Sequence, residues 1–184
     1  MNSLKKKNVA VIVLGDIGRS PRMQYHAISL LKEGYNVDLI GYDGVKPVAE
    51  IQNDPNIKLH FLSRLEFSKS FPLLFGYGLK IIWQCLCLFW TLLWKRRSNY
   101  VIVQTPPAIP ALFISWLYCL LVQSKLIIDW HNYAFTIMSL THGKKHMLVK
   151  MSIWFEGFFG RKSDGNLCVT KAMREDLKSR WNIK

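Results

Sequence analysis

The sequence predicts a Rossmann-like α/β fold, in which helices cover both faces of a parallel sheet. Short, unbroken apolar runs are typical of strands that are buried on both faces, and the first of them spans residues 9–14. Segments of helical character alternate with these runs, which indicates parallel strands joined by helical crossovers. The chain has no internal repeat and no low-complexity linker, so we expect one domain over residues 1–184.

The expected elements follow one another in regular alternation. Strands are expected at residues 9–14, 36–41, 57–62, 100–104, 125–129 and 165–169. Helices are expected at 21–33, 107–122, 145–161 and 171–181, with a short turn or helix near 48–53 and a long apolar helix before residue 95. The first helix has the clearest signals: Ser20 can cap it, and Pro21 suits its first position. Its apolar face is expected to hold Met23, Ala27, Leu30 and Leu31, and Gly34 ends it.

The loop after the first strand combines glycines with polar and charged side chains. Gly15 and Gly18 flank Asp16, and Arg19, Ser20 and Arg22 follow. A strand, a glycine loop and a helix form the unit in which open α/β sheets hold phosphorylated ligands. The glycine spacing is not GxGxxG and there is no Walker lysine, so a generic tight turn is the alternative interpretation.

A second group of polar residues, Asp129, His131 and Asn132, follows the strand at 125–129. The carboxyl ends of parallel strands bind ligands, so this group would converge with the glycine loop if the two strands are neighbours. A histidine beside a carboxylate could accept a proton or orient a phosphate. In the alternative, Asp129 caps the next segment and His131 packs at its start. His142 and His146 are four residues apart, but Gly143 and two lysines lie between them, and we expect no metal and no cofactor.

The charge balance predicts an anionic partner. The 25 Lys and Arg residues against 12 Asp and Glu give a net charge of +13, and residues 67–128 contain no acidic residue at all. Four tryptophans, Trp83, Trp90, Trp94 and Trp116, lie in the same region. They belong to Leu- and Ile-rich helical runs rather than to an alternating stacking surface, which argues against nucleic acid. Cations beside Trp-rich apolar helices instead favour a membrane surface.

The two apolar regions are short for a membrane span. Residues 81–94 and 108–122 each fall below the roughly 20 apolar residues that a spanning helix needs. Extending the first region to 71–94 places Gly76, Gly78 and Lys80 inside it. We favour helices that cover the sheet and turn one side to the membrane, with wholly buried helices and a true span as alternatives. The N-terminal residues 1–8 contain no apolar segment, so we expect neither a secretory signal nor an N-terminal anchor.

The four cysteines show neither CxxC nor zinc-finger spacing, which indicates buried, reduced thiols in a protein that faces the cytosol.

Four segments carry a resemblance to a known family. They are VIVLGDIGRSPRMQYHA, VQTPPAIPAL, KLIIDWHNY, and NLCVTKAMREDL with the Trp181 that closes the last helix. In this order, and over essentially the whole chain, they resemble the chitobiosyldiphosphodolichol β-mannosyltransferases. The resemblance implies a GT-B glycosyltransferase, which has two Rossmann-like domains and an active site between them. It also implies that the N-terminal half handles the lipid-linked acceptor and the C-terminal half the sugar nucleotide.

The activity implied by the resemblance is transfer of mannose from GDP-mannose to dolichol-diphosphate-linked chitobiose in N-glycan precursor assembly. The resemblance also implies a location at the cytosolic face of the endoplasmic reticulum membrane. The sequence ends at Lys184, so we expect the donor domain to be absent and the isolated chain to be inactive. Two alternatives are a membrane-associated regulatory subunit that binds the acceptor or another glycosyltransferase, and a half-enzyme completed by a separate donor chain.

Inverting mannosyl transfer needs a base and stabilisation of a departing diphosphate, and the resemblance suggests residues for both. Asp16 and His131 are the candidate bases, with a slight preference for Asp16, because two arginines would keep it ionised. Asp129 would orient His131. The expected substrate-binding residues are Gly15, Gly18, Arg19, Ser20, Arg22, Asp129 and Asn132. We expect Glu156 to be structural.

Overall fold

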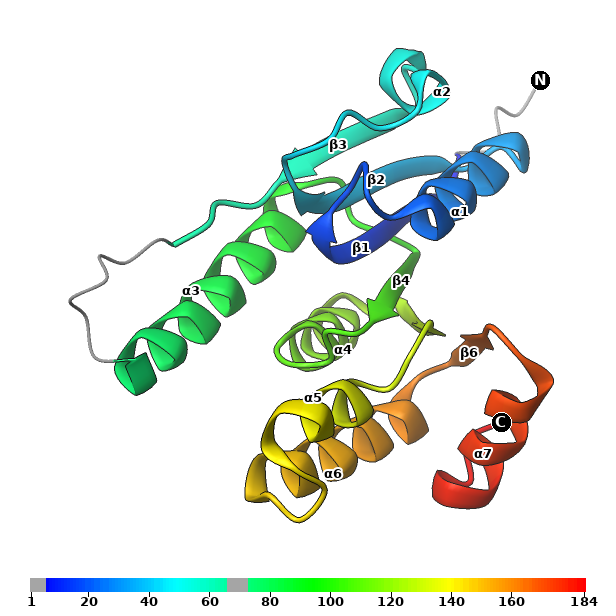
Figure 1. The fold of residues 1–184 in the computed structure, drawn as a ribbon. Helices are drawn as coiled ribbons and strands as arrows, with labels where there is room; N and C mark the ends of the chain where they lie inside the picture. The colour runs from blue at the N-terminus through cyan, green and yellow to red at the C-terminus, as the bar shows by residue number, and fades with distance from the viewer. Residues whose placement is uncertain (1–5, 66–72) are drawn as a thin grey trace. The chain divides into compact units, whose positions relative to one another are not determined.

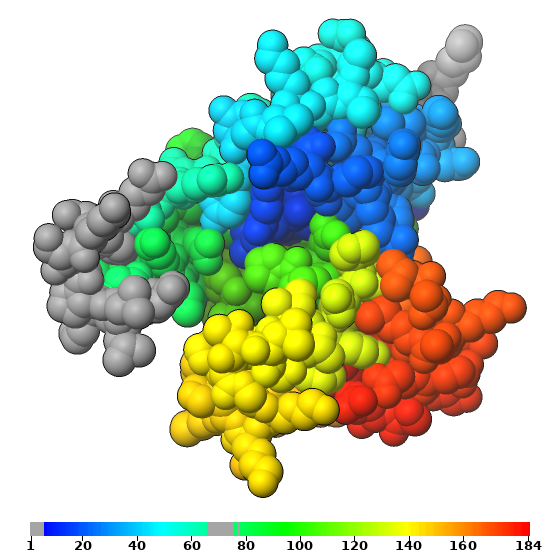
Figure 2. Space-filling model, in the orientation of Figure 1, coloured from blue at the N-terminus to red at the C-terminus, as the bar shows by residue number. Residues whose placement is uncertain are grey.

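The computed structural model describes residues 6–65 and 73–184, drawn as a ribbon in Figure 1 and as a space-filling surface in Figure 2. Its contacts divide the chain into two compact units, Met1–Tyr100 and Val101–Lys184, called unit 1 and unit 2 below. The expectation of one domain over residues 1–184 stays a prediction.

Unit 1 contains strands β1 (Asn8–Asp16), β2 (Asn36–Tyr42) and β3 (Ile57–Phe61). Their order is β3-β2-β1, and both pairs are parallel, with Val9 opposite Val37 and Val37 opposite Ile57. Helix α1 (Pro21–Lys32) joins the first two strands, and the short α2 (Ala49–Asn53) joins the next two. Residues 9–14 of β1 are all buried, as expected for a strand covered on both faces.

Helix α3 (Leu73–Trp94) follows β3 and packs Leu88 and Leu92 inward. The expected range 71–94 and the acid-free region 67–128 both begin before residue 73, and these first residues lie outside the described part of the chain. In the part that the structure describes, no helix combines the length and the apolar character needed to cross a membrane. The four cysteines are free, as expected, but only Cys119 is buried, since Cys85 and Cys87 on α3 and Cys168 on β6 are partly exposed.

Unit 2 contains strands β4 (Tyr100–Thr105), β5 (Lys125–Trp130) and β6 (Gly165–Cys168), in the order β4-β5-β6. Helices α4 (Ala111–Val122), α5 (Ala134–His142) and α6 (Met147–Lys162) connect them, and α7 (Lys171–Trp181) follows β6. Both units therefore alternate strands and helices in the manner of a Rossmann half. The predicted Rossmann-like α/β fold is confirmed, and each expected strand is present with its ends shifted by no more than two residues.

The buried face of α1 differs from the expected one. Met23 and Ala27 are buried as expected, but Gln24 and Ile28 take the places predicted for Leu30 and Leu31. The Gln24 side chain is buried because its amide forms hydrogen bonds with three backbone groups. It donates to the carbonyls of Ile17 and Gly18, both at 3.1 Å, and accepts from Val48 N at 2.9 Å. Ser20 precedes the helix as predicted, but its side chain makes no capping hydrogen bond.

Two helices begin at places that the sequence did not reveal. Helix α4 starts at Ala111 rather than at residue 107, because Pro110 occupies the N-cap and disfavours helical geometry in the residue before it. Helix α5 was not predicted at all. Its N-cap, Tyr133, makes no side-chain capping bond, and none of its residues is buried, so neither a cap nor an apolar face marks it in the sequence.

Helix α5 is capped from another helix. Glu156 of α6 is fully buried, and its two carboxylate oxygens accept hydrogen bonds from Ala134 N at 2.8 Å and Phe135 N at 3.0 Å. A hydrogen bond from Ser152 Oγ adds to these at 3.3 Å. Burial raises the pKa of Glu156 to about 7, although the backbone N–H groups oppose the rise. Glu156 therefore has the structural role that we expected.

The stability of unit 2 should depend on the protonation of Glu156. Its pKa is raised from 4.5 to about 7 on folding, so the folded state holds the proton more tightly. The stabilisation is complete below about pH 4.5 and is lost as the pH rises through 7. Replacing Glu156 by Gln should remove this dependence, so the thermal midpoint of Glu156→Gln should fall less between pH 4.5 and pH 8 than that of the parent chain.

The exposed Glu175, whose carboxylate contacts the neighbouring Arg174, provides the control. Glu175→Gln should keep the pH dependence of the parent. The interpretation is wrong if Glu156→Gln keeps it as well.

Candidate functional site

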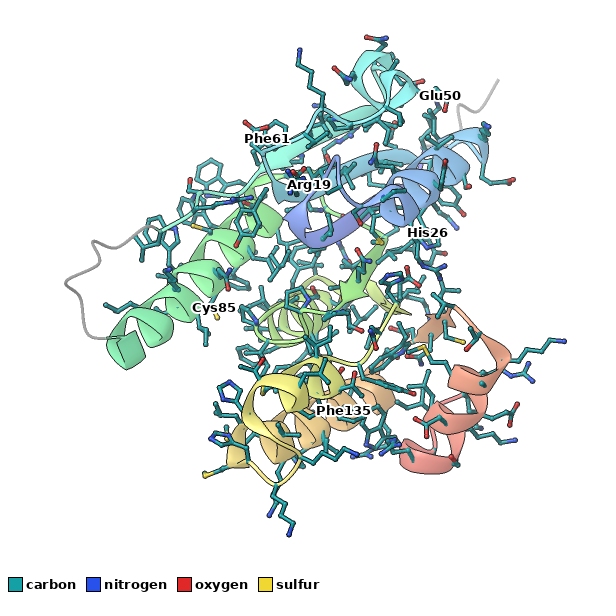
Figure 3. The ribbon with its side chains drawn as sticks, viewed as in Figure 1. Arg19, His26, Glu50, Phe61, Cys85 and Phe135 are labelled. Carbon is teal, nitrogen blue, oxygen red and sulfur yellow. The ribbon has the colours of Figure 1, made fainter. Side chains whose placement is uncertain are left out.

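Asp16 ties the glycine loop to the loop after β2. Its Oδ1 accepts from Gly18 N and its Oδ2 from Val45 N, each at 2.9 Å, and the Arg19 guanidinium lies 3.4 Å from Oδ2. The Val45 N–H contributes most to lowering the pKa of Asp16, against a smaller opposing effect of burial. The carboxylate is thus ionised and already engaged with two backbone N–H groups. Figure 3 shows Arg19 on this same loop.

Close backbone approach explains the glycines that surround Asp16. A Cβ at Gly18 would lie 2.0 Å from the Val45 carbonyl oxygen, and one at Gly44 would lie 2.2 Å from Oδ2 of Asp16. Gly15 is different, because its Cβ would meet only Val13 Cγ2 at an ordinary 3.6 Å. The structure thus gives Gly18 a packing role. A contact of Gly15 or Gly18 with a ligand stays a prediction.

This difference can be tested by a matched pair of substitutions. Gly18→Ala should destabilise unit 1 by about 1–3 kcal/mol, because the methyl group has no room beside the Val45 carbonyl. Gly15→Ala should leave the free energy of unfolding nearly unchanged. Denaturant unfolding of both variants measures the difference, and equal losses would contradict the packing role of Gly18.

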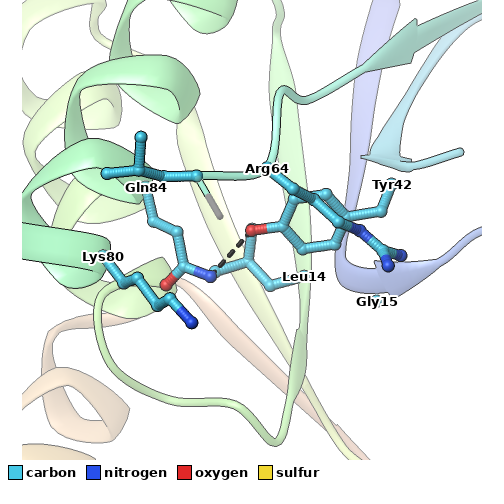
Figure 4. A pocket seen from close by; sticks show the side chains of 7 residues that line it. Leu14, Gly15, Tyr42, Arg64, Lys80 and Gln84 are labelled. Atoms are coloured by element: carbon cyan, nitrogen blue, oxygen red, sulfur yellow. Dashed lines mark hydrogen bonds between the residues drawn. The ribbon is translucent and has the colours of Figure 1, made fainter. Parts of the chain in front are cut away.

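A pocket of about 430 Å³ opens beside Gly15 (Figure 4). It is called the strand-end pocket below, and its lining residues come from β1, β2, the segment after β3, and α3: Leu14, Gly15, Tyr42, Arg64, Leu65, Lys80 and Gln84. Two of them are cationic and none is acidic. Sequence reasoning named Gly15 but missed Tyr42, Arg64 and Gln84, because nothing in the linear pattern shows that these four segments meet.

Several contacts fix the polar groups of the strand-end pocket. The Gln84 amide donates to the Tyr42 hydroxyl at 2.7 Å, as the dashed line in Figure 4 marks. The Arg64 guanidinium lies 4.8 Å from the centre of the Tyr42 ring and donates to Asp43 O at 3.4 Å. Burial raises the pKa of Tyr42, so its hydroxyl is neutral at physiological pH.

The polar group after β5 is held by the end of β4. The N–H groups of His131 and Asn132 donate to Thr105 O at 3.1 and 3.3 Å, and Thr105 Oγ1 donates back to Asn132 O at 3.2 Å. Asn132 Oδ1 accepts from Tyr133 N at 2.8 Å. Asp129 is fully buried, whereas His131 is exposed. The backbone of His131 is therefore fixed while its imidazole is displayed to solvent.

The aromatic residues around His131 are structural. Trp130 is fully buried, donates from Nε1 to Asn166 Oδ1 at 2.8 Å, and packs against Tyr133 and Trp181 with ring centres 6.1 and 5.9 Å away. The Tyr133 hydroxyl donates to Asp176 at 2.8 Å, and burial together with this carboxylate raises the pKa of Tyr133. This packing stabilises the segment that presents His131.

The predicted site residues form two groups. Gly15, Asp16, Gly18, Arg19, Ser20 and Arg22 belong to unit 1, and Asp129, His131 and Asn132 belong to unit 2. The convergence of these two groups stays a prediction, as does orientation of His131 by Asp129. His146 accepts from Leu148 N and so caps α6, with the His142 ring centre 5.0 Å from its own. The described residues contain no group of three or more His, Cys, Asp or Glu side chains that could hold a metal ion.

Comparison with known proteins gives a consistent result. No family model matches the chain. The chitobiosyldiphosphodolichol beta-mannosyltransferase of Homo sapiens is 46% identical over 178 residues, which are 97% of this chain and 38% of that protein. The enzyme of the same name from Yarrowia lipolytica is 40% identical over 181 residues, 97% of this chain and 39% of that protein.

The chain is homologous to part of the chitobiosyldiphosphodolichol beta-mannosyltransferases. The resemblance predicted from the sequence motifs is therefore confirmed. The chain spans about two fifths of the length of these curated relatives. UDP-glycosyltransferase TURAN of Arabidopsis thaliana is also similar, with 34% identity over 98% of this chain and 40% of that protein.

Among solved structures, apo UGT2 of Phytolacca americana aligns with 73% of this chain and 32% of that chain, at 10% identity. The TM-score is 0.44, too low for the alignment to bear on the fold. The beta-mannosyltransferase relationship rests on the sequence, and it covers both polar groups, the one after β1 and the one after β5.

Proposed function

We propose that this chain is the acceptor-side part of a β-1,4-mannosyltransferase that moves mannose from GDP-mannose to dolichol-diphosphate chitobiose. The supporting observation is the 40–46% identity to beta-mannosyltransferases over 97–98% of the chain. GDP-mannose would bind mainly to a donor domain of the GT-B fold, and the 184 residues alone would transfer no mannose. The Arabidopsis relative is named a UDP-glycosyltransferase, so any test of this function must establish which nucleotide the sugar donor carries.

His131 is the better of the two candidate bases. The carboxylate of Asp16 already accepts two backbone N–H bonds, and its lowered pKa makes it a weak proton acceptor. His131 combines a fixed backbone with an exposed imidazole. The proposal thus reverses the slight preference that the sequence gave to Asp16. Arg19 and Arg22 would offset the charge of a diphosphate, and Ser20 and Asn132 would contribute polar contacts.

The roles of Asp16 and His131 can be separated in a full-length protein that contains this part. His131→Ala should lower turnover by about a hundred- to ten-thousandfold while leaving the thermal midpoint unchanged. Asp16→Asn should instead lower the thermal midpoint, because a neutral amide binds the Gly18 and Val45 N–H groups less well. His142→Ala is a control on an unrelated histidine. The assignment is wrong if Asp16→Asn abolishes turnover at an unchanged midpoint while His131→Ala remains active.

We expect contact with the cytosolic face of the endoplasmic reticulum membrane through α3, whose exposed side includes Leu86, Trp90, Leu93 and Trp94. Two of the cations that follow α3, Lys95 and Arg96, already make contacts within unit 1. Arg96 lies 3.6 Å from the buried carboxylate of Asp38, and Lys95 donates to Arg96 O and to Ser98 Oγ. Reversing these charges would disturb unit 1 itself, so the apolar side chains give the cleaner test.

Binding to vesicles that contain anionic lipid measures this contact. The double variant Trp90→Ser, Trp94→Ser should bind about tenfold or more weakly, because both indoles are largely exposed and have apolar surface to bury. Phe61→Ser, at an exposed position of β3, should bind like the parent. Unchanged binding by the double variant would show that α3 is not the contact.

A further inference from the structure

We propose that the strand-end pocket binds the diphosphate of an isoprenoid-linked substrate, and that the isoprenoid chain lies along one exposed stripe of α3. The stripe consists of Leu79, Trp83, Leu86, Trp90 and Trp94. It belongs to the side of α3 that would contact the membrane, so the isoprenoid chain would lie where α3 meets the lipid. The identity of the ligand rests on the proposed function, whereas the binding chemistry rests on the residues of unit 1.

The pocket offers three donors to an anion, and none of its lining residues in the described part of the chain is a carboxylate. Arg64 is held in place by the Tyr42 ring and by Asp43 O. Lys80 is exposed and lies one turn before Gln84 on α3, so both side chains are on the same side of the helix (Figure 4). The Tyr42 hydroxyl accepts from Gln84, which leaves its own O–H free to donate. A guanidinium, an ammonium and a phenol around one cavity suit the several oxygens of a diphosphate.

The stripe on α3 adjoins the pocket, because Leu79 and Trp83 directly precede the lining residues Lys80 and Gln84. Its residues are spaced by four, three, four and four positions, which places them along one side of the helix. Their exposed fractions run from 36% for Trp83 to 73% for Trp94. The Trp83 indole donates to Ser63 O at 3.1 Å, so the stripe passes beside the segment that carries Arg64. From Leu79 to Trp94 the helix rises by about 22 Å, enough for several isoprenoid units.

A charged pocket with an apolar stripe beside it matches an amphiphile better than it matches a nucleotide. The diphosphate group is common to a lipid-linked acceptor and to a sugar nucleotide, and Arg64 and Lys80 would attract either one. The stripe distinguishes the lipid-linked acceptor from the sugar nucleotide, since only the isoprenoid chain would bury apolar surface against Leu86 and its neighbours.

The head group is tested by calorimetric titration of the 184-residue chain with pyrophosphate. Arg64→Gln and Lys80→Gln should each weaken binding about ten- to hundredfold, the effect of losing one charge-assisted contact. Lys58→Gln makes the same change at an exposed position of β3 and should bind like the parent. Arg64→Lys keeps the charge and should retain most of the affinity, which separates loss of the anion contact from loss of folding.

The apolar stripe is tested by comparing pyrophosphate, GDP and farnesyl diphosphate. Farnesyl diphosphate should bind at least tenfold more tightly than the other two. Leu86→Gln should remove part of that advantage without changing the affinity for pyrophosphate. Leu120→Gln is the matched control, because this leucine is equally exposed but lies on α4 in unit 2.

Two results would overturn the proposal. Unchanged pyrophosphate binding by both Arg64→Gln and Lys80→Gln would exclude the pocket, and GDP binding as tightly as farnesyl diphosphate would exclude the stripe. Neither result depends on mannose transfer. Failure of a full-length protein to transfer mannose, with these binding results intact, would instead refute the proposed function and leave the isoprenoid diphosphate site standing.

Discussion

The carboxyl edge of unit 1 depends on the two hydrogen bonds that Asp16 accepts from Gly18 N and Val45 N. They bring the loop after β1 against the loop after β2, so closely that neither Gly18 nor Gly44 has room for a Cβ. Gln24 reinforces the same junction by pairing Ile17 O, Gly18 O and Val48 N. With these loops fixed, β1 and β2 end at a defined place, where Gly15 and Tyr42 line the strand-end pocket.

Unit 2 uses a carboxylate in the same way. Glu156 binds the first two N–H groups of α5, which would otherwise lack partners, and so connects α5 to α6. The cost of burying this charge appears in its pKa, which rises to about 7. The segment between β5 and α5 is thereby held at both ends, by Thr105 and by Glu156, and His131 lies on this segment. In each unit a structural carboxylate fixes a loop that carries predicted site residues.

The strands could be predicted from the sequence because each is a local apolar run, and α1 because its capping signals are local as well. Helix α5 could not be predicted, since the group that caps it lies 22 residues away along the chain, in α6. The burial of Gln24 was missed for a similar reason: its partners lie on two loops that meet only in the folded unit. The motif residues after β1 and β5 were found from the sequence, but the engagement of Asp16 was not, because Val45 comes from a different loop. The strand-end pocket is the extreme case, with lining residues from four separate segments.

We propose that this chain recognises the acceptor in preference to the donor. The most direct measurement presents the purified 184-residue chain with chitobiosyl-diphosphate lipid and with GDP-mannose, separately and together, and records binding of each and formation of a trisaccharide. We expect the chain to bind the lipid-linked acceptor at least tenfold more tightly than GDP-mannose and to form no trisaccharide. Binding of GDP-mannose as tight as binding of the acceptor, or formation of trisaccharide by the chain alone, would contradict this.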